Sequence, residues 1–116
     1  MTFEFIAYKT LPEVKIIVGK EFKDDRGFFS EIFREDAFVE QGLPRFVQIN
    51  HSRSSGECIR GLHYQLPPKA QAKLVYCISG SIWDVAVDIR KGSPTYKKST
   101  MIPLGDWTIP TAVYIP

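Results

Sequence analysis

Residues 81–90 alternate between two kinds of side chain, and this alternation most constrains the fold. The two sets are Trp83, Val85, Val87 and Ile89 on one side and Asp84, Ala86, Asp88 and Arg90 on the other. A helix has a period of about 3.6 residues and would mix the two sets, whereas the two-residue period of a strand separates them. The alternation therefore predicts a β-strand.

Other short runs of β-branched and aromatic residues have the length of strands and end at Gly, Pro or polar positions. They cover residues 14–18, 27–33, 46–52, 58–65, 73–78 and 113–115. The Ser79-Gly80 pair predicts a tight hairpin turn between the run at residues 73–78 and the strand at residues 81–90. Many short strands separated by turns are typical of an all-β sandwich or barrel.

Residues 34–41 alone have a helical pattern, in which Ala37, Phe38 and Gln41 recur at positions i, i+1 and i+4. Acidic residues occupy the first turn, where they complement the helix dipole, and Gly42 supplies a stop. We expect one short surface helix.

Composition indicates one soluble domain over residues 1–116, because 44% of the 116 residues are hydrophobic and 24% are charged. The two cysteines have no metal-binding spacing, and residues 1–7 do not form a typical signal peptide, so we expect a cytoplasmic protein. No apolar run approaches the about 18 residues of a membrane span. The net charge of +2, without a basic block, argues against nucleic acid as a partner.

Both histidines lie within one dense stretch, residues 48–65. Arg60 and His63 would point to opposite faces of a regular strand, so a bulge at Gly61 is needed to turn both toward one cavity. Taken alone, such a histidine is more often a structural residue than a base. His51 and His63 are far apart in sequence and no third histidine exists, so we expect no metal.

Five ordered blocks carry a family resemblance: residues 24–31 (DDRGFFSE), 48–55 (QINHSRSS), 60–65 (RGLHYQ), 72–75 (AKLV) and 84–95 (DVAVDIRKGSPT). Together they resemble dTDP-4-dehydrorhamnose 3,5-epimerases, from about residue 12 to 95 and more loosely to 114–116. The resemblance implies a cupin-like jelly-roll β-sandwich that works without a metal or cofactor. It also implies a homodimer that acts on a dTDP-4-keto-6-deoxyhexose.

The same resemblance implies roles for individual residues. His63 corresponds to the general base and Lys73 to the cation that stabilises the enolate. The positions that correspond to nucleotide-sugar contacts are Arg26, Glu31, Gln48, Asn50 and Arg60, and secondary candidates are Phe29, His51 and Asp84. The chemistry is consistent, because abstraction of a proton beside a ketone needs a near-neutral base and a charge at the ketone oxygen.

Asp84 and Asp88 share one side of the alternating strand. They either enter the cavity, where they could pair with Lys73, or form a solvated outer face.

The chain also departs from the family pattern. Family members continue beyond the segment that corresponds to 114–116, to a tyrosine that returns the proton and an acid that orients the histidine. This sequence ends at Pro116, so we expect a C-terminally incomplete jelly roll without these two groups. Ile49 stands where the family usually has Asp.

Three functions therefore stay open. The first is a 3,5-epimerase of dTDP-L-rhamnose biosynthesis, which supplies deoxysugars for lipopolysaccharide O-antigen. The second is a non-catalytic relic that binds nucleotide sugars. The third is a related enzyme that epimerises one centre or shifts the ketone.

Overall fold

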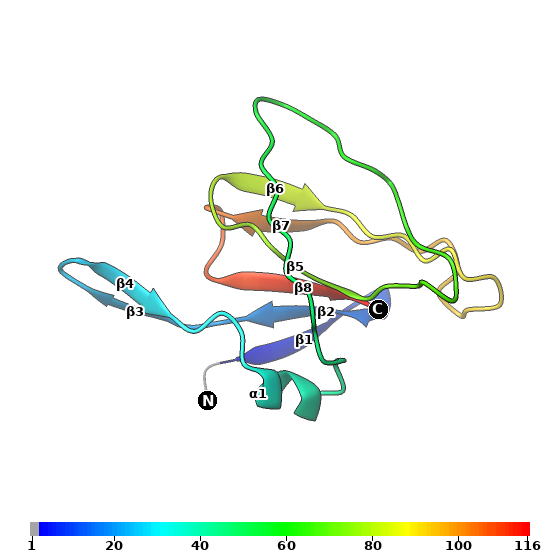
Figure 1. Ribbon diagram of the computed structural model, residues 1–116, viewed down its shortest axis with the longest axis horizontal. Helices are drawn as coiled ribbons and strands as arrows, with labels where there is room; N and C mark the ends of the chain where they lie inside the picture. Colours follow the sequence, from blue (N-terminus) through cyan, green and yellow to red (C-terminus); the bar gives the residue numbers. More distant parts are fainter. Residues whose placement is uncertain (1–2) are drawn as a thin grey trace.

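The computed structural model describes residues 3–116 as a set of short strands with one short helix (Figure 1). In chain order the elements are β1 (Glu4–Tyr8), β2 (Leu11–Val18), β3 (Glu21–Asp24), β4 (Gly27–Ser30), α1 (Glu35–Glu40), β5 (Lys73–Tyr76), β6 (Ser81–Asp84), β7 (Ile102–Gly105) and β8 (Thr111–Ile115). This composition confirms the all-β prediction and the short helix.

A four-stranded antiparallel sheet with the order β1-β2-β8-β5 forms the centre of the molecule. Strands β6 and β7 form a second, two-stranded sheet, and β3 pairs only with β4. Because β8 lies between β2 and β5, the two ends of the sequence are joined in one sheet. The first strand of the chain and the last are therefore separated by a single neighbour.

The central sheet packs on both faces, and successive residues of β8 show this. Val113 belongs to a core cluster with Leu104 of β7, whereas Ala112 belongs to a cluster with Phe38 of α1. All four of these side chains are fully buried. The rings of Phe3, Phe5 and Phe33 make T-shaped contacts with the ring of Phe38, at centroid distances of 5.0, 5.4 and 4.9 Å. Helix α1 thus covers one face and the β6–β7 pair the other.

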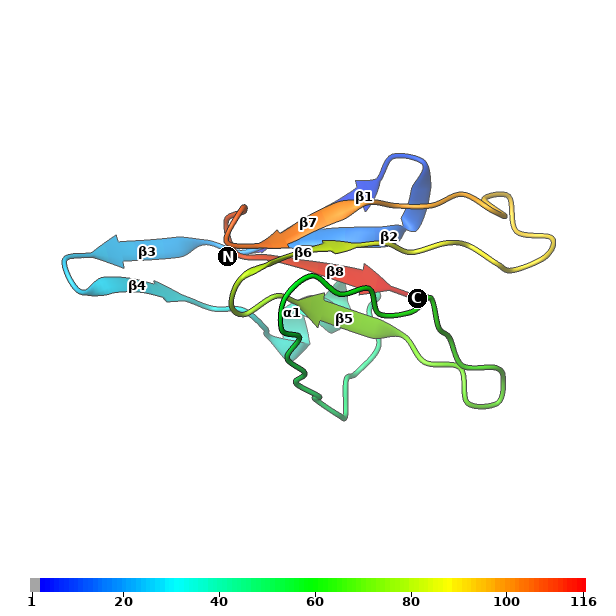
Figure 2. The ribbon, with the colours of Figure 1, turned by 90° about the horizontal axis from the view of Figure 1, so that it is seen from above.

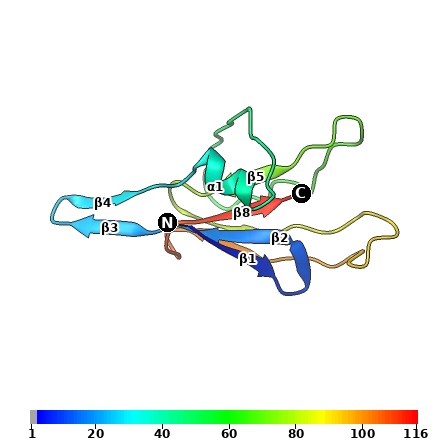
Figure 3. The same ribbon diagram turned by 90° about the horizontal axis from the view of Figure 1, so that it is seen from below.

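The β3–β4 hairpin extends away from this core. Figures 2 and 3 show it at one end of the molecule, with the loop near residue 90, in yellow, at the other. The radius of gyration is 15.0 Å, compared with about 13.4 Å for a compact domain of this length. The fold is therefore more open than its size requires.

Three predictions about the strands are wrong. Strands β5 and β6 belong to different sheets, so Ser79 and Gly80 do not close a hairpin. Gly80 instead lies against the end of β7, where its carbonyl accepts a hydrogen bond from the Asp106 amide at 2.8 Å. A Cβ at Gly105 would lie 2.1 Å from that carbonyl oxygen, so the close approach requires glycine.

Residues 46–52 and 58–65 were predicted as strands, but the structure assigns no strand there. Their composition suits a strand, yet no neighbouring strand is placed to accept their main-chain hydrogen bonds. Without a ladder there is also no bulge at Gly61, which instead has a φ of +102° in an irregular segment.

Candidate active site

Five of the ten predicted site residues lie on one long segment without regular structure, residues 44–72, between α1 and β5. Gln48 and Asn50 are two positions apart, so they share one side of the extended backbone. Gln48 Nε2 donates a hydrogen bond to Asn50 Oδ1 at 3.1 Å. Val47 and Ile49 alternate with them. His51 follows and is exposed.

Arg60 is held by the same segment. Its Nε donates to Ser54 Oγ at 2.7 Å, and its Nη2 donates to the carbonyl oxygen of Arg53 at 3.0 Å. These two bonds use only part of the guanidinium, which has five N–H donors. The remaining donors face solvent and are available to an anion.

The imidazole of His63 lies close to the backbone of Gly61. A Cβ placed on Gly61 would lie 2.9 Å from His63 Nδ1, which is closer than non-bonded atoms approach, so the imidazole occupies the space that a side chain would fill. The left-handed φ of Gly61 favours glycine for the same reason. Arg60 and His63 therefore flank a position whose backbone conformation and surroundings favour glycine.

Lys73 and Asp84 come from two different sheets. Lys73 begins β5 opposite Ile115, and Asp84 ends β6 opposite Ile102. Asp84 is half-buried, one of its carboxylate oxygens has no hydrogen-bond partner, and burial raises the pKa of the carboxyl group. None of the ion pairs in residues 3–116 joins Asp84 to Lys73, so the pairing that one of the two sequence interpretations allowed is not formed.

Arg26, Phe29 and Glu31 lie on or beside the β3–β4 hairpin, away from the segment that carries His63. The Arg26 amide and guanidinium donate to the Asp24 carboxylate at 2.9 and 2.7 Å, and these bonds hold the pKa of Asp24 below its usual range. Arg26 and Phe29 line a shallow hollow of about 240 Å³. Glu31 lies 4.0 Å from Arg34.

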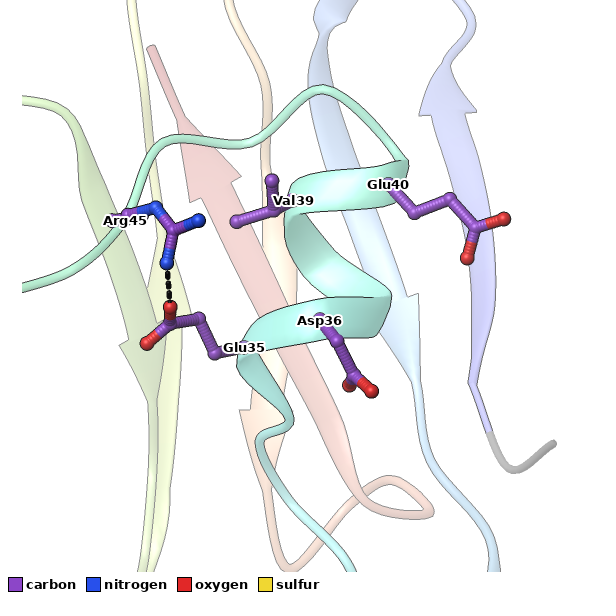
Figure 4. A pocket seen from close by; sticks show the side chains of 5 residues that line it. All are labelled: Glu35, Asp36, Val39, Glu40 and Arg45. Carbon is purple, nitrogen blue, oxygen red and sulfur yellow. Dashed lines mark hydrogen bonds and ion pairs between the residues drawn. The ribbon is translucent and has the colours of Figure 1, made fainter.

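A larger hollow of about 610 Å³ lies beside α1 and contains none of the predicted site residues. Figure 4 shows Arg45 reaching across it to Glu35, while Asp36 and Glu40 point elsewhere. No three His, Cys, Asp or Glu side chains within residues 3–116 gather as metal ligands. No helix in the same part of the chain is long and apolar enough to cross a membrane.

Sequence reasoning missed the most highly connected polar group. Asp88 is 5% exposed, and its carboxylate accepts hydrogen bonds from Arg90, Ser93 and Thr95. These bonds hold its pKa far below the usual range. Asp88 is thus buried in a polar cluster, which neither of the two sequence interpretations anticipated. The Asp-x-Arg-x-x-Ser-x-Thr spacing was the available signal.

A family model described as dTDP-4-dehydrorhamnose 3,5-epimerase matches residues 8–116. The chain belongs to this family. It is 54% identical over 91 residues to the dTDP-4-dehydrorhamnose 3,5-epimerase of Shigella flexneri, a match that covers 76% of this chain and 50% of that one. The enzyme of the same name from Methanothermobacter thermautotrophicus is 49% identical over 105 residues, which are 89% of this chain and 56% of that one.

Solved epimerase structures have the same fold. The crystal structure from Sulfolobus tokodaii superposes with a TM-score of 0.90 at 39% identity and covers 100% of this chain and 64% of its own. The Legionella pneumophila epimerase, in complex with dTDP-4-keto-L-rhamnose, gives a TM-score of 0.90 at 41% identity, covering 98% and 60%. The cupin-like fold prediction is confirmed. The chain spans about half the length of the curated epimerases it matches.

Proposed function

We propose that this chain binds a dTDP-4-keto-6-deoxyhexose and carries the proton-abstracting part of the 3,5-epimerase reaction. The observation that carries the proposal is the arrangement of Arg60 and His63 around Gly61, in a chain that belongs to the epimerase family. Arg60, the proposed phosphate-binding donor, and His63, the proposed base, lie three positions apart on a segment open to solvent.

The reaction begins at a C–H bond beside the C4 ketone. Neutral His63 takes the proton from C3 or C5, and the electron pair of that bond delocalises onto the ketone oxygen as an enolate. The ammonium of Lys73 stabilises the charge on that oxygen, a contribution of about 2 to 4 kcal/mol to the barrier for one well-placed donor. Return of a proton to the opposite face of the carbon completes the inversion.

Binding uses groups that do not react. The free donors of Arg60 suit the pyrophosphate, because a planar guanidinium gives two parallel charge-assisted bonds. Gln48 and Asn50 contribute amide groups to the sugar or base, and Arg26, Phe29 and Glu31 contribute from the hairpin. His51 and Asp84 have secondary roles.

Of the groups that the reaction needs, the proton donor is the one that the described residues supply least well. Burial raises the pKa of Tyr76 to about 12 and also raises the pKa of Tyr114, so both phenols are weaker acids than free tyrosine. No carboxylate in residues 3–116 accepts a hydrogen bond from His63. This favours a second candidate function, a nucleotide-sugar-binding module without turnover.

We also propose a domain organisation, a cellular location, a pathway and an oligomeric state for the whole protein. We place residues 1–116 in a single epimerase domain, active in the cytoplasm in the synthesis of dTDP-L-rhamnose for O-antigen. The domain forms a homodimer through the projecting hairpin. Phe22 and Phe29 are paired across that hairpin, and both are exposed, which supplies an apolar surface for a second copy.

Titration calorimetry with dTDP tests the binding site. The wild-type chain should bind dTDP, and Arg60→Ala should weaken binding by about 1.5 to 3 kcal/mol, because charge-assisted bonds to phosphate are lost. Arg45→Ala is the matched control, since Arg45 pairs with Glu35 beside α1 and should leave affinity unchanged. Absence of heat with the wild-type chain would refute both candidate functions.

A further inference from the structure

Three lysines without an ion-pair partner lie on the loop that follows β6. Lys91, Lys97 and Lys98 are all exposed, and none of the ion pairs within residues 3–116 involves any of them. The charge of their neighbour Arg90 is already compensated, because its guanidinium pairs with two carboxylates. We call residues 90–98 the basic loop. It presents three uncompensated positive charges to solvent.

Hydrogen bonds on both sides of its base fix the basic loop. The Lys97 amide donates to the Asp88 carbonyl oxygen at 2.7 Å, and the Asp88 amide donates to the Lys98 carbonyl oxygen at 2.9 Å. Within the loop, the hydroxyls of Ser93 and Thr95 donate to the Asp88 carboxylate, both at 2.6 Å. The lysines therefore project from a loop of defined shape.

Lys97 occupies a backbone conformation that lysine rarely adopts. Its φ is +69°, and it is the only residue other than glycine with a positive φ in residues 3–116. Glycine or asparagine is favoured there, because the Cβ of other residues raises the energy of the left-handed region. A lysine at such a position costs stability, so a role in holding the loop together does not explain it. A role for its charge does.

The basic loop lies at the end of the molecule where the proposed enolate-stabilising lysine is found. Figures 1 and 2 show the loop, in yellow, at the end opposite the β3–β4 hairpin. In both views β6 points toward this loop and β5 starts on the same side. Lys73 is the first residue of β5 and Asp84 the last of β6.

Charge is also divided unevenly along the chain. Residues 46–116 carry eight Lys and Arg against four Asp and Glu, whereas residues 1–45 carry seven against nine. The positive half contains the proposed phosphate-binding Arg60 and the proposed base His63. A surface with three lysines is too small to neutralise the run of phosphates on a nucleic acid, but it attracts a small anion such as a nucleoside diphosphate.

We propose that the basic loop steers the diphosphate of the nucleotide sugar toward the site by long-range attraction, without contacting the ligand once it is bound. This inference rests on the proposed function, which supplies the anionic ligand. Attraction of this kind raises the association rate and leaves the dissociation rate nearly unchanged. Salt weakens it, because the Debye length falls from about 30 Å at 0.01 M to about 8 Å at 0.15 M.

Stopped-flow fluorescence tests the proposal. The full 116-residue chain is mixed with dTDP that carries a fluorescent label on its ribose. Lys97→Gly/Lys98→Ser should lower the association rate constant by about 5-fold or more at an ionic strength of about 0.01 M. The difference from the wild type should vanish at about 0.5 M, and the dissociation rate constant should stay within about 2-fold.

Two control variants separate charge at this loop from net charge and from stability. Lys20→Ser/Lys23→Ser removes the same charge at the opposite end, where β3 begins, and should change the association rate constant by less than about 2-fold. Lys97→Arg keeps the charge and should associate at the wild-type rate. Lys97→Gly should associate more slowly although its melting temperature is unchanged or higher, because glycine fits the positive φ.

Equal association rates for the two double variants at low ionic strength would overturn the proposal. Faster dissociation of Lys97→Gly/Lys98→Ser with unchanged association would also overturn it, because the lysines would then contact the bound ligand. In both cases labelled dTDP still binds, so the proposed function stands while steering fails. Absence of binding by the wild-type chain would refute both.

Discussion

The guanidinium of Arg90 bridges the carboxylates of Asp88 and Glu13, which are 75 positions apart in the sequence. Its Nε and Nη2 donate to Asp88 at 2.9 and 3.0 Å, and its Nη1 and Nη2 donate to Glu13 at 3.1 and 2.6 Å. Glu13 lies on β2, so the bridge fastens the loop after β6 to the central sheet. Asp88 is buried and Glu13 is exposed, so the two halves of the bridge differ in environment.

Asp88→Asn should destabilise the fold, since one acceptor oxygen becomes an NH2 that faces the donors of Arg90 and Ser93. We expect the melting temperature to fall by about 5 °C or more. Asp24→Asn is the matched control, because Asp24 also pairs with an arginine two positions later but lies on the exposed hairpin. Equal shifts for the two variants, measured by calorimetry, would contradict this account of the cluster.

The Asp88 cluster should also make stability depend on pH. Arg90, Ser93 and Thr95 lower the folded-state pKa of Asp88 below its usual value of 3.8. The stabilisation is therefore present above that value and is lost as the pH falls toward the folded-state pKa. Between pH 7 and pH 3, the free energy of unfolding measured with urea should fall less for Asp88→Asn than for the wild type. An equal loss of unfolding free energy in both proteins would show that Asp88 is not a source of the pH dependence.

Asp84→Asn should have the opposite effect on stability at neutral pH. Burial raises the folded-state pKa of Asp84 above 3.8, so the folded state holds its proton more tightly than the unfolded state. Stability from this group is then highest at acid pH and falls as the pH rises through the folded-state pKa. Removing the charge should raise the melting temperature at pH 7 by about 2 to 5 °C and have little effect near pH 3. A lower melting temperature at pH 7 would mean that the charge is stabilised by an ion pair.

Gly61→Ala should displace the imidazole of His63 without unfolding the chain. The new Cβ would lie 2.9 Å from Nδ1, and a misplacement of about 1 Å in a reacting group can cost about 100-fold in rate. Gly56→Ala is the control, because Gly56 also has a positive φ but has no atom within 4 Å of a Cβ. The rate of solvent deuterium exchange into substrate is the measurement. Equal exchange rates for Gly61→Ala and Gly56→Ala would show that Gly61 does not position the imidazole of His63.

Phe29→Asp should weaken the proposed dimer by about 30-fold or more, as loss of a central aromatic anchor does in other interfaces. Phe29 pairs with Phe22 across the hairpin, whereas Phe28 faces the other side. Phe28→Asp is accordingly the control. Sedimentation equilibrium measures the association, and a wild-type mass of 13.2 kDa at high concentration would disprove the dimer.

Local signals in the sequence predicted the helix and several strands. Acidic residues and Gly42 bracket α1, which the structure places at Glu35–Glu40, within one residue of the predicted ends. Strands β2, β5 and β8 were predicted because their residues pack in the sheet. Strands β1, β3 and β7 were missed, and the exposed β3 has no buried face to produce an alternating pattern.

Tertiary contacts account for what the sequence could not predict. The burial of Asp88, which with Asp84 was expected to face a cavity or solvent, is a local exception, because its donors Arg90, Ser93 and Thr95 lie only two to seven positions along the chain. The roles of His63 and Lys73 came from family resemblance. Lys73 is placed by the pairing of β5 with β8, whereas His63 lies on an irregular segment, and no local pattern specifies how the two lie relative to each other.

Solvent deuterium exchange tests the central claim most directly. The chain is incubated with dTDP-4-keto-6-deoxyglucose in deuterated water, and deuterium at C3 and C5 is followed by mass spectrometry and NMR. Exchange should occur through His63, with inversion slow because a positioned acid contributes about 100- to 10,000-fold. His63→Ala should abolish exchange, and Lys73→Ala should reduce it sharply by leaving the enolate without its cation. Exchange that persists in His63→Ala, or its complete absence from the wild-type chain, would contradict the assignment of His63 as the base.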